Sequence, residues 1–125
     1  MKIRLIKSQL ETKEKIEKIA EAMGIDPLWA SAMAMTESSL GVQKVSPTGC
    51  LGVFQMSTIA MRDLHESMRS GTDNTVDIAC GLAFLYLLLK RHKTIKKATE
   101  KFCAPADRDF YFDRMMSYMK VLNED

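Results

Sequence analysis

The stretch ESSLGVQKVSPTGCLGVFQM, from Glu37 to Met56, is the most informative part of this sequence. It begins with a single carboxylate at the end of an apolar helical segment. A Ser-Pro-Thr-Gly turn follows, then Gly52 and Gln55, and the next acidic residue is Asp63. One Glu beside a polar loop is typical of a general acid, which is one half of glycosidase chemistry.

An all-α fold is predicted around this stretch, with at most a tiny β-hairpin, because no alternating strand pattern of useful length appears. Gly24 is expected to end the first helix. Asp26 is expected to cap the second helix, with Pro27 at its first position. The helices are expected at about residues 8–23, from Pro27 to near Glu37, from Ser57 or Thr58 to about 68, at 74–92, from Thr94 to Cys103 and at 107–122.

Two of these helices are expected to form the core. The second helix carries an inward stripe of Trp29, Met33 and alanines. The helix at 74–92 is apolar on every side, which is typical of a central and fully buried helix.

The position of Glu37 predicts an acid with a raised pKa. Its apolar neighbours and the carboxyl end of the helix both disfavour the charged form.

The stretch at 37–56 resembles the central motif of the soluble lytic transglycosylases, the SLT branch of the lysozyme-like superfamily. That family carries Glu-Ser, then Ala-x-Ser-x-x-Gly, then Gly-Leu-Met-Gln. Here Glu37-Ser38, the turn Ser46-Pro47-Thr48-Gly49 and the segment Gly52-Val53-Phe54-Gln55 occur at matching spacing. By this resemblance the chain, residues 1–125, is one lysozyme-like domain, and Glu37 is its catalytic acid.

The resemblance extends over about residues 25–118 but weakens toward the end. The segment 77–85 is similar to the family's Asn-Ile-x-x-Gly-x-x-Tyr-Leu helix, and 98–105 is similar to its Ala-x-x-x-Tyr-Asn-Ala-Gly segment. In the family that second Tyr reaches toward the acid. Phe102 stands in its place here, so slower turnover is expected unless Tyr111 or Tyr86 supplies the missing hydroxyl from another helix.

The resemblance implies that this chain cleaves the glycan strands of peptidoglycan between MurNAc and GlcNAc. One Glu would act first as acid and then as base, and the product would carry a 1,6-anhydro ring. No second carboxylate, metal or cofactor is required. The implied substrate-binding residues are Ser38, Ser46, Gly49, Gln55, Met56 and Tyr111.

Each of these residues also has a plain structural interpretation. Ser38 either orients the carboxylate or caps the helix, and Gln55 either binds a sugar or fixes the loop. Ser46 and Gly49 are turn formers as well as sugar contacts. Met56 is core filler or groove lining, and Tyr111 reaches the site or packs in the core.

Two other classes of protein remain open. A muramidase of the goose-type lysozyme kind shares the fold and hydrolyses the same bond, with added carboxylates holding a water. Asp63, Glu66, Asp73 and Asp77 are the candidates for that role. The third class is a glycan-binding relic without activity, although such a relic has no reason to keep an acid in apolar surroundings.

The charge and composition of the chain limit the kinds of binding partner that it is expected to have. The net charge of +2 is too small to argue for nucleic acid. The basic run at 90–97 is interpreted as a solvated helix end, with weak attraction to anionic wall polymers as the alternative. Three cysteines at no zinc-type spacing are expected to be free thiols, or to include a Cys80–Cys103 pair. His65 and His92 are isolated.

The sequence shows no membrane span, since the apolar run at 78–89 is too short. Arg4 and Lys7 interrupt the apolar residues of the N-terminus, so it lacks a signal-peptide core. A monomer is expected that acts in the periplasm or cell wall. It would reach its substrate by holin release, in a virion, or as a mature or truncated form, and a phage origin is favoured.

Overall fold

The structure is a computed structural model, and it describes residues 3–43, 52–55, 74–102 and 107–124. This part of the chain is all-α, as predicted, and contains no strand. Its helices are α1 (Lys7–Met23), α2 (Pro27–Ser38), α4 (Thr75–His92), α5 (Ile95–Phe102) and α6 (Arg108–Asn123). The predicted helix at about 57–68 lies outside the described residues.

Local signals account for the ends of the first two helices. Gly24 follows α1 in the left-handed conformation, with φ of 74°, and this favours glycine. The Asp26 side chain accepts hydrogen bonds from the backbone N–H groups of Leu28, at 2.9 Å, and Trp29, at 3.4 Å. Pro27 stands directly after this cap. Both boundaries confirm the sequence-based prediction.

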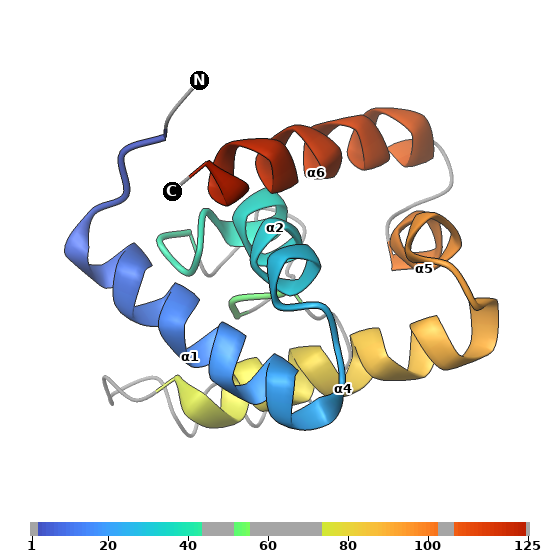
Figure 1. The fold of residues 1–125 in the computed structure, drawn as a ribbon, viewed down its shortest axis with the longest axis horizontal. Coiled ribbons are helices and arrows are strands. Elements are labelled where there is room, and N and C mark those ends of the chain that lie inside the picture. The colour runs from blue at the N-terminus through green and yellow to red at the C-terminus, as the bar shows by residue number, and fades with distance from the viewer. Residues whose placement is uncertain (1–2, 44–51, 56–73, 103–106, 125) are drawn as a thin grey trace.

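The central helix is α2, which packs against α1 on one side and α6 on the other. Figure 1 shows it enclosed by the other helices. Trp29, Ala30 and Met33 are fully buried, as predicted from the inward stripe. The indole N–H of Trp29 donates to the Thr99 hydroxyl at 2.9 Å and so ties α2 to α5.

The prediction that the helix at 74–92 is buried on every side is wrong. In α4, Ile78, Leu82 and Leu85 are fully buried. By contrast, Val76 is 48% exposed and Leu87 is 56% exposed. The reason is that α4 covers one side of the fold, where it packs on α1 and α5. The enclosed helix is instead α2, which packs against α1 and α6 and is buried throughout residues 29–35.

None of the described helices combines the length and the hydropathy that crossing a bilayer requires.

Candidate active site

The C-terminal end of α2 carries the candidate acid. Glu37 is the next-to-last residue of this helix and is half-buried. The chain then turns back sharply, because Ser39, Leu40 and Gly41 all have positive φ, at 51°, 56° and 88°. Two of these residues are not glycines, and such residues adopt this conformation only where the surrounding structure holds it. Leu40 is buried to 1% exposure, and its burial provides that hold.

A tyrosine from the last helix contacts the acid directly. The Tyr111 hydroxyl, in the first turn of α6, donates a hydrogen bond to Glu37 Oε1 at 2.6 Å. The sulfur of Met33, one helical turn before Glu37, lies 3.8 Å from the same hydroxyl. Tyr111 therefore supplies the hydroxyl that Phe102 lacks, while the other candidate, Tyr86, lies beneath Lys90, whose nitrogen is 5.3 Å from its ring.

Burial raises the pKa of Glu37 from 4.5 to about 7, and the hydrogen bond from Tyr111 acts in the opposite direction. Burial disfavours the carboxylate, whereas a donor to the carboxylate favours it. The first effect is the larger. The expectation of a raised Glu37 pKa is confirmed.

The Ser38 side chain forms hydrogen bonds with backbone groups, as expected for a residue that caps the helix. Its buried hydroxyl donates to the carbonyl oxygen of Val53 at 2.5 Å, with the carbonyl of Ala34 at 3.3 Å as a weaker acceptor. It accepts from the backbone N–H of Gly41 at 2.9 Å. These bonds fasten both the chain reversal and the turn at 52–55 to the end of α2. Ser38 thus holds the backbone around Glu37 in place.

Gln55 likewise has contacts that fix the loop. Its side-chain amide donates to the carbonyl oxygens of Gly52, at 2.8 Å, and Gln43, at 3.3 Å. Its backbone is left-handed, with φ of 54°. The bond to Gln43 joins the two described parts of the central motif, residues 37–43 and 52–55.

A feature that the sequence analysis missed is the way α4 supports this turn. Asp77 is buried, and its carboxylate accepts from the N–H of Val53 at 3.1 and 3.3 Å. Gly52, with φ of 87°, passes so close that a Cβ atom would collide with this carboxylate. One turn further along α4, a Cβ atom at Gly81 would collide with the Phe54 ring. The spacing of four residues between Asp77 and Gly81, one helical turn, is the sequence signal for a shared face.

Several predicted site residues lie outside the described residues. These are Ser46, Gly49 and Met56, together with the acidic residues Asp63, Glu66 and Asp73. Cys103 also lies outside the described residues, and Cys80 is a half-buried free thiol, in agreement with the first of the two expectations for the cysteines. In the described part of the chain no cluster of His, Cys, Asp and Glu is suited to a metal ion.

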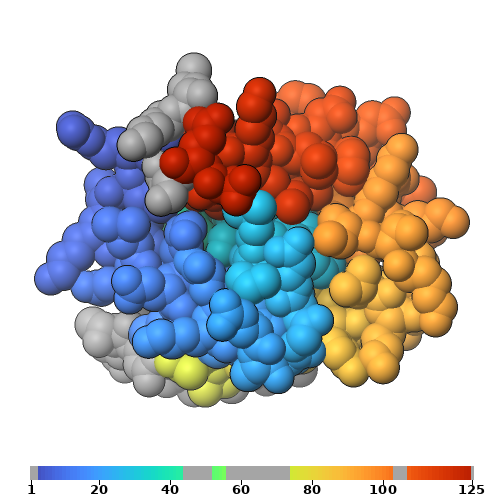
Figure 2. Space-filling model, viewed as in Figure 1, coloured from blue at the N-terminus to red at the C-terminus, as the bar shows by residue number. Residues whose placement is uncertain are grey.

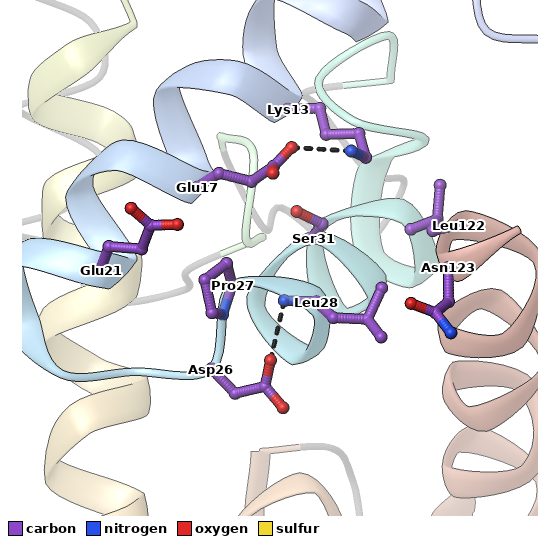
Figure 3. Close-up of a pocket in the computed structure, with 9 residues that line it drawn as sticks. All are labelled: Lys13, Glu17, Glu21, Asp26, Pro27, Leu28, Ser31, Leu122 and Asn123. Atoms are coloured by element: carbon purple, nitrogen blue, oxygen red, sulfur yellow. Dashed lines mark hydrogen bonds and ion pairs between the residues drawn. The ribbon is translucent and has the colours of Figure 1, made fainter. Parts of the chain in front are cut away.

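A separate cavity of about 440 Å³ lies at the opposite end of α2. Figure 3 shows it between α1, the start of α2 and the end of α6. Lys13 and Glu17, whose charged atoms are 2.7 Å apart, form one wall. Neither Glu37 nor Tyr111 lines this cavity. Its lining residues are Lys13, Glu17, Glu21, Asp26, Pro27, Leu28, Ser31, Leu122 and Asn123.

Comparison of this chain with protein-family models, with curated proteins and with solved structures finds no match. The resemblance to the lytic transglycosylases therefore depends on the motif residues and their spacing.

Proposed function

We propose that this chain is a peptidoglycan lytic transglycosylase with a lysozyme-like fold. The observation that carries the proposal is the state of Glu37. It is a half-buried carboxyl group with a pKa of about 7, held by the Tyr111 hydroxyl at 2.6 Å. A general acid works best when its pKa lies near the working pH.

The proposed mechanism uses Glu37 twice. In its protonated form it gives its proton to the oxygen of the MurNAc–GlcNAc bond, and the bond from that oxygen to the anomeric carbon breaks. The C6 hydroxyl of the same MurNAc then attacks the anomeric carbon. The Glu37 carboxylate takes the proton from this hydroxyl and returns to its starting state, leaving a 1,6-anhydro ring. No water is consumed, so one carboxyl group is sufficient.

Tyr111 fits this cycle as a positioning residue. Its hydrogen bond stabilises the carboxylate that exists between the two proton transfers. It also fixes the direction in which the second carboxyl oxygen points. The balance between burial and this bond keeps the protonated and ionised forms of Glu37 within easy reach of each other.

Hydrolysis would need a second carboxylate to hold a water. The buried carboxylate of Asp77 is engaged by the Val53 N–H, so it is not free for that task. Asp77, the candidate second carboxylate that the structure describes, therefore favours ring closure over hydrolysis. The proposed place of action is the periplasm or cell wall, and the proposed sugar contacts Ser46, Gly49 and Met56 belong to the same motif.

Mass spectra of the fragments released from purified peptidoglycan sacculi test the proposal. We expect 1,6-anhydro-MurNAc ends, each lighter than a hydrolytic end by a water molecule. Reducing MurNAc ends alone would move the protein to the muramidase class. Absence of any cleavage would leave only the glycan-binding alternative.

The variant Glu37→Gln should keep the fold and lose lysis by about a hundredfold or more, because it removes the proton but little volume. Glu14→Gln, at an exposed position of α1, is the matched control and should lyse sacculi at the wild-type rate. Wild-type lysis by a folded Glu37→Gln protein would show that Glu37 is not the acid.

A further inference from the structure

The charge of this chain is unevenly distributed. Residues 90–101 contain six lysines and arginines and one glutamate, a formal charge of +5. The remainder of the chain has 12 cations against 15 acidic residues, a charge of −3, although the total is only +2. The positive charge of the protein is therefore concentrated in one short segment of the sequence.

The fold gathers these cations at one end of the molecule. The segment comprises the last turn of α4 and most of α5, which pack against each other. Figures 1 and 2 show α5 and the end of α4 together forming the right-hand end of the fold. All six cations are exposed: Lys90, Arg91, Lys93, Lys96, Lys97 and Lys101.

The dipole of α4 explains only part of this cluster. Cations in the last turn of a helix are favoured there, and this applies to Lys90 and Arg91. It does not apply to Lys97, which lies near the start of α5, where a cation is disfavoured. Lys97 and Lys101 are four residues apart and so share one exposed face of α5.

Exposed apolar side chains on α4 lie close to part of this basic cluster. Phe84 is 37% exposed and Leu87 is 56% exposed. With Arg91 they follow a spacing of three and four residues, which places all three on one helix face. The Phe84 ring meets Phe102, at the end of α5, edge-on at 5.6 Å between centroids. The exposed apolar residues of α4 thus lie next to α5, the helix that carries Lys97 and Lys101.

We infer that this surface docks on an anionic lipid membrane. The basic–apolar face is defined here as Phe84, Leu87, Arg91, Lys97 and Lys101. The cations would lie against the headgroup phosphates, and Leu87 and Phe84 would enter the interfacial layer. A soluble polyanion would match the cations but would leave the apolar side chains in water. The inference concerns binding alone and does not depend on the proposed catalysis.

Sedimentation with lipid vesicles tests this inference. The probes are vesicles of phosphatidylcholine mixed with phosphatidylglycerol, and vesicles of phosphatidylcholine alone. We expect partition onto the mixed vesicles to be at least about tenfold stronger, because each cation near an anionic surface contributes on the order of fivefold. We also expect it to weaken with added salt. Equal partition onto both vesicles, or none onto either, would overturn the inference.

A matched pair of triple variants locates the surface. Arg91→Gln with Lys97→Gln and Lys101→Gln should weaken partition onto the mixed vesicles about tenfold or more. Lys7→Gln, Lys18→Gln and Lys120→Gln remove the same charge from exposed positions on α1 and α6 and should change it by less than about threefold. Equal losses in both triples would show a non-specific attraction and would contradict a defined face.

Leu87→Ser separates a membrane from a soluble polyanion. This exposed substitution should leave the helical circular dichroism unchanged and should lower partition on the order of threefold, by removing apolar contact with the lipid. Wild-type partition by Leu87→Ser would show that the cations act alone, and the lipid assignment would be wrong.

Discussion

At Glu37, burial and the Tyr111 hydrogen bond act on the pKa in opposite directions. Burial is dominant and raises the pKa to about 7. The acid must be protonated to begin the proposed reaction, so kcat/KM should fall as the pH rises through about 7. Since Tyr111 lowers the pKa, the variant Tyr111→Phe should raise it and shift this alkaline limb to higher pH.

Tyr111→Phe should also slow the maximal rate on the order of tenfold, because the carboxylate formed between the two proton transfers loses a donor. The measurement is the pH profile of sacculus lysis. Tyr118→Phe is the matched control on the same helix, where the ring lies beneath Arg114 at 5.9 Å, and its profile should equal that of wild type. An alkaline limb that moved to lower pH in Tyr111→Phe would contradict the role assigned to this hydrogen bond.

At the scale of the element, α4 acts as a support for the turn at 52–55. Asp77 holds the Val53 N–H, and Gly81 leaves room for the Phe54 ring. Gly81→Ala should therefore destabilise the protein by about 1–3 kcal/mol through overpacking. This loss should appear even though alanine is favoured over glycine within a helix by about 1 kcal/mol.

Urea unfolding followed by circular dichroism measures this effect. Ala83→Gly, at an exposed position two residues along α4, is the reference for helix propensity and should cost about 0.5–1 kcal/mol. If Gly81→Ala instead stabilised the protein, the Phe54 ring would not be confined by α4.

At the scale of the whole molecule, α2 links the other helices into one core. Trp29 is the single tryptophan of the chain, is fully buried, and bonds Thr99 on α5 at 2.9 Å. We expect one cooperative unfolding transition, so that Trp29 fluorescence and helical circular dichroism give the same midpoint. Two separated midpoints would indicate two independent folding units.

Thr99→Val extends this prediction. It leaves the buried indole N–H without its acceptor, which costs about 1–3 kcal/mol. In a single cooperative unit both midpoints should fall together. A fall in the fluorescence midpoint alone would again argue for separate units.

The sequence by itself determined the all-α class, the boundaries of α1 and α2 and the place of Glu37 at the end of a helix. These features depend on residues within a few positions of each other, such as the Asp26 cap, Pro27 and the Gly24 stop. The raised pKa of Glu37 followed from the same local reasoning, because apolar neighbours and the helix end were visible in the sequence.

Only the tertiary structure decided which tyrosine meets the acid, since Tyr111 and Glu37 are 74 residues apart. It also decided that Ser38 and Gln55 bond the backbone of the loop, and that Asp77 holds the Val53 N–H. The wrong prediction that α4 is buried on every side also arose because tertiary packing cannot be read from the sequence of one helix. An apolar composition measures how much a helix gains from burial, but the packing of the other helices decides which side of it is covered.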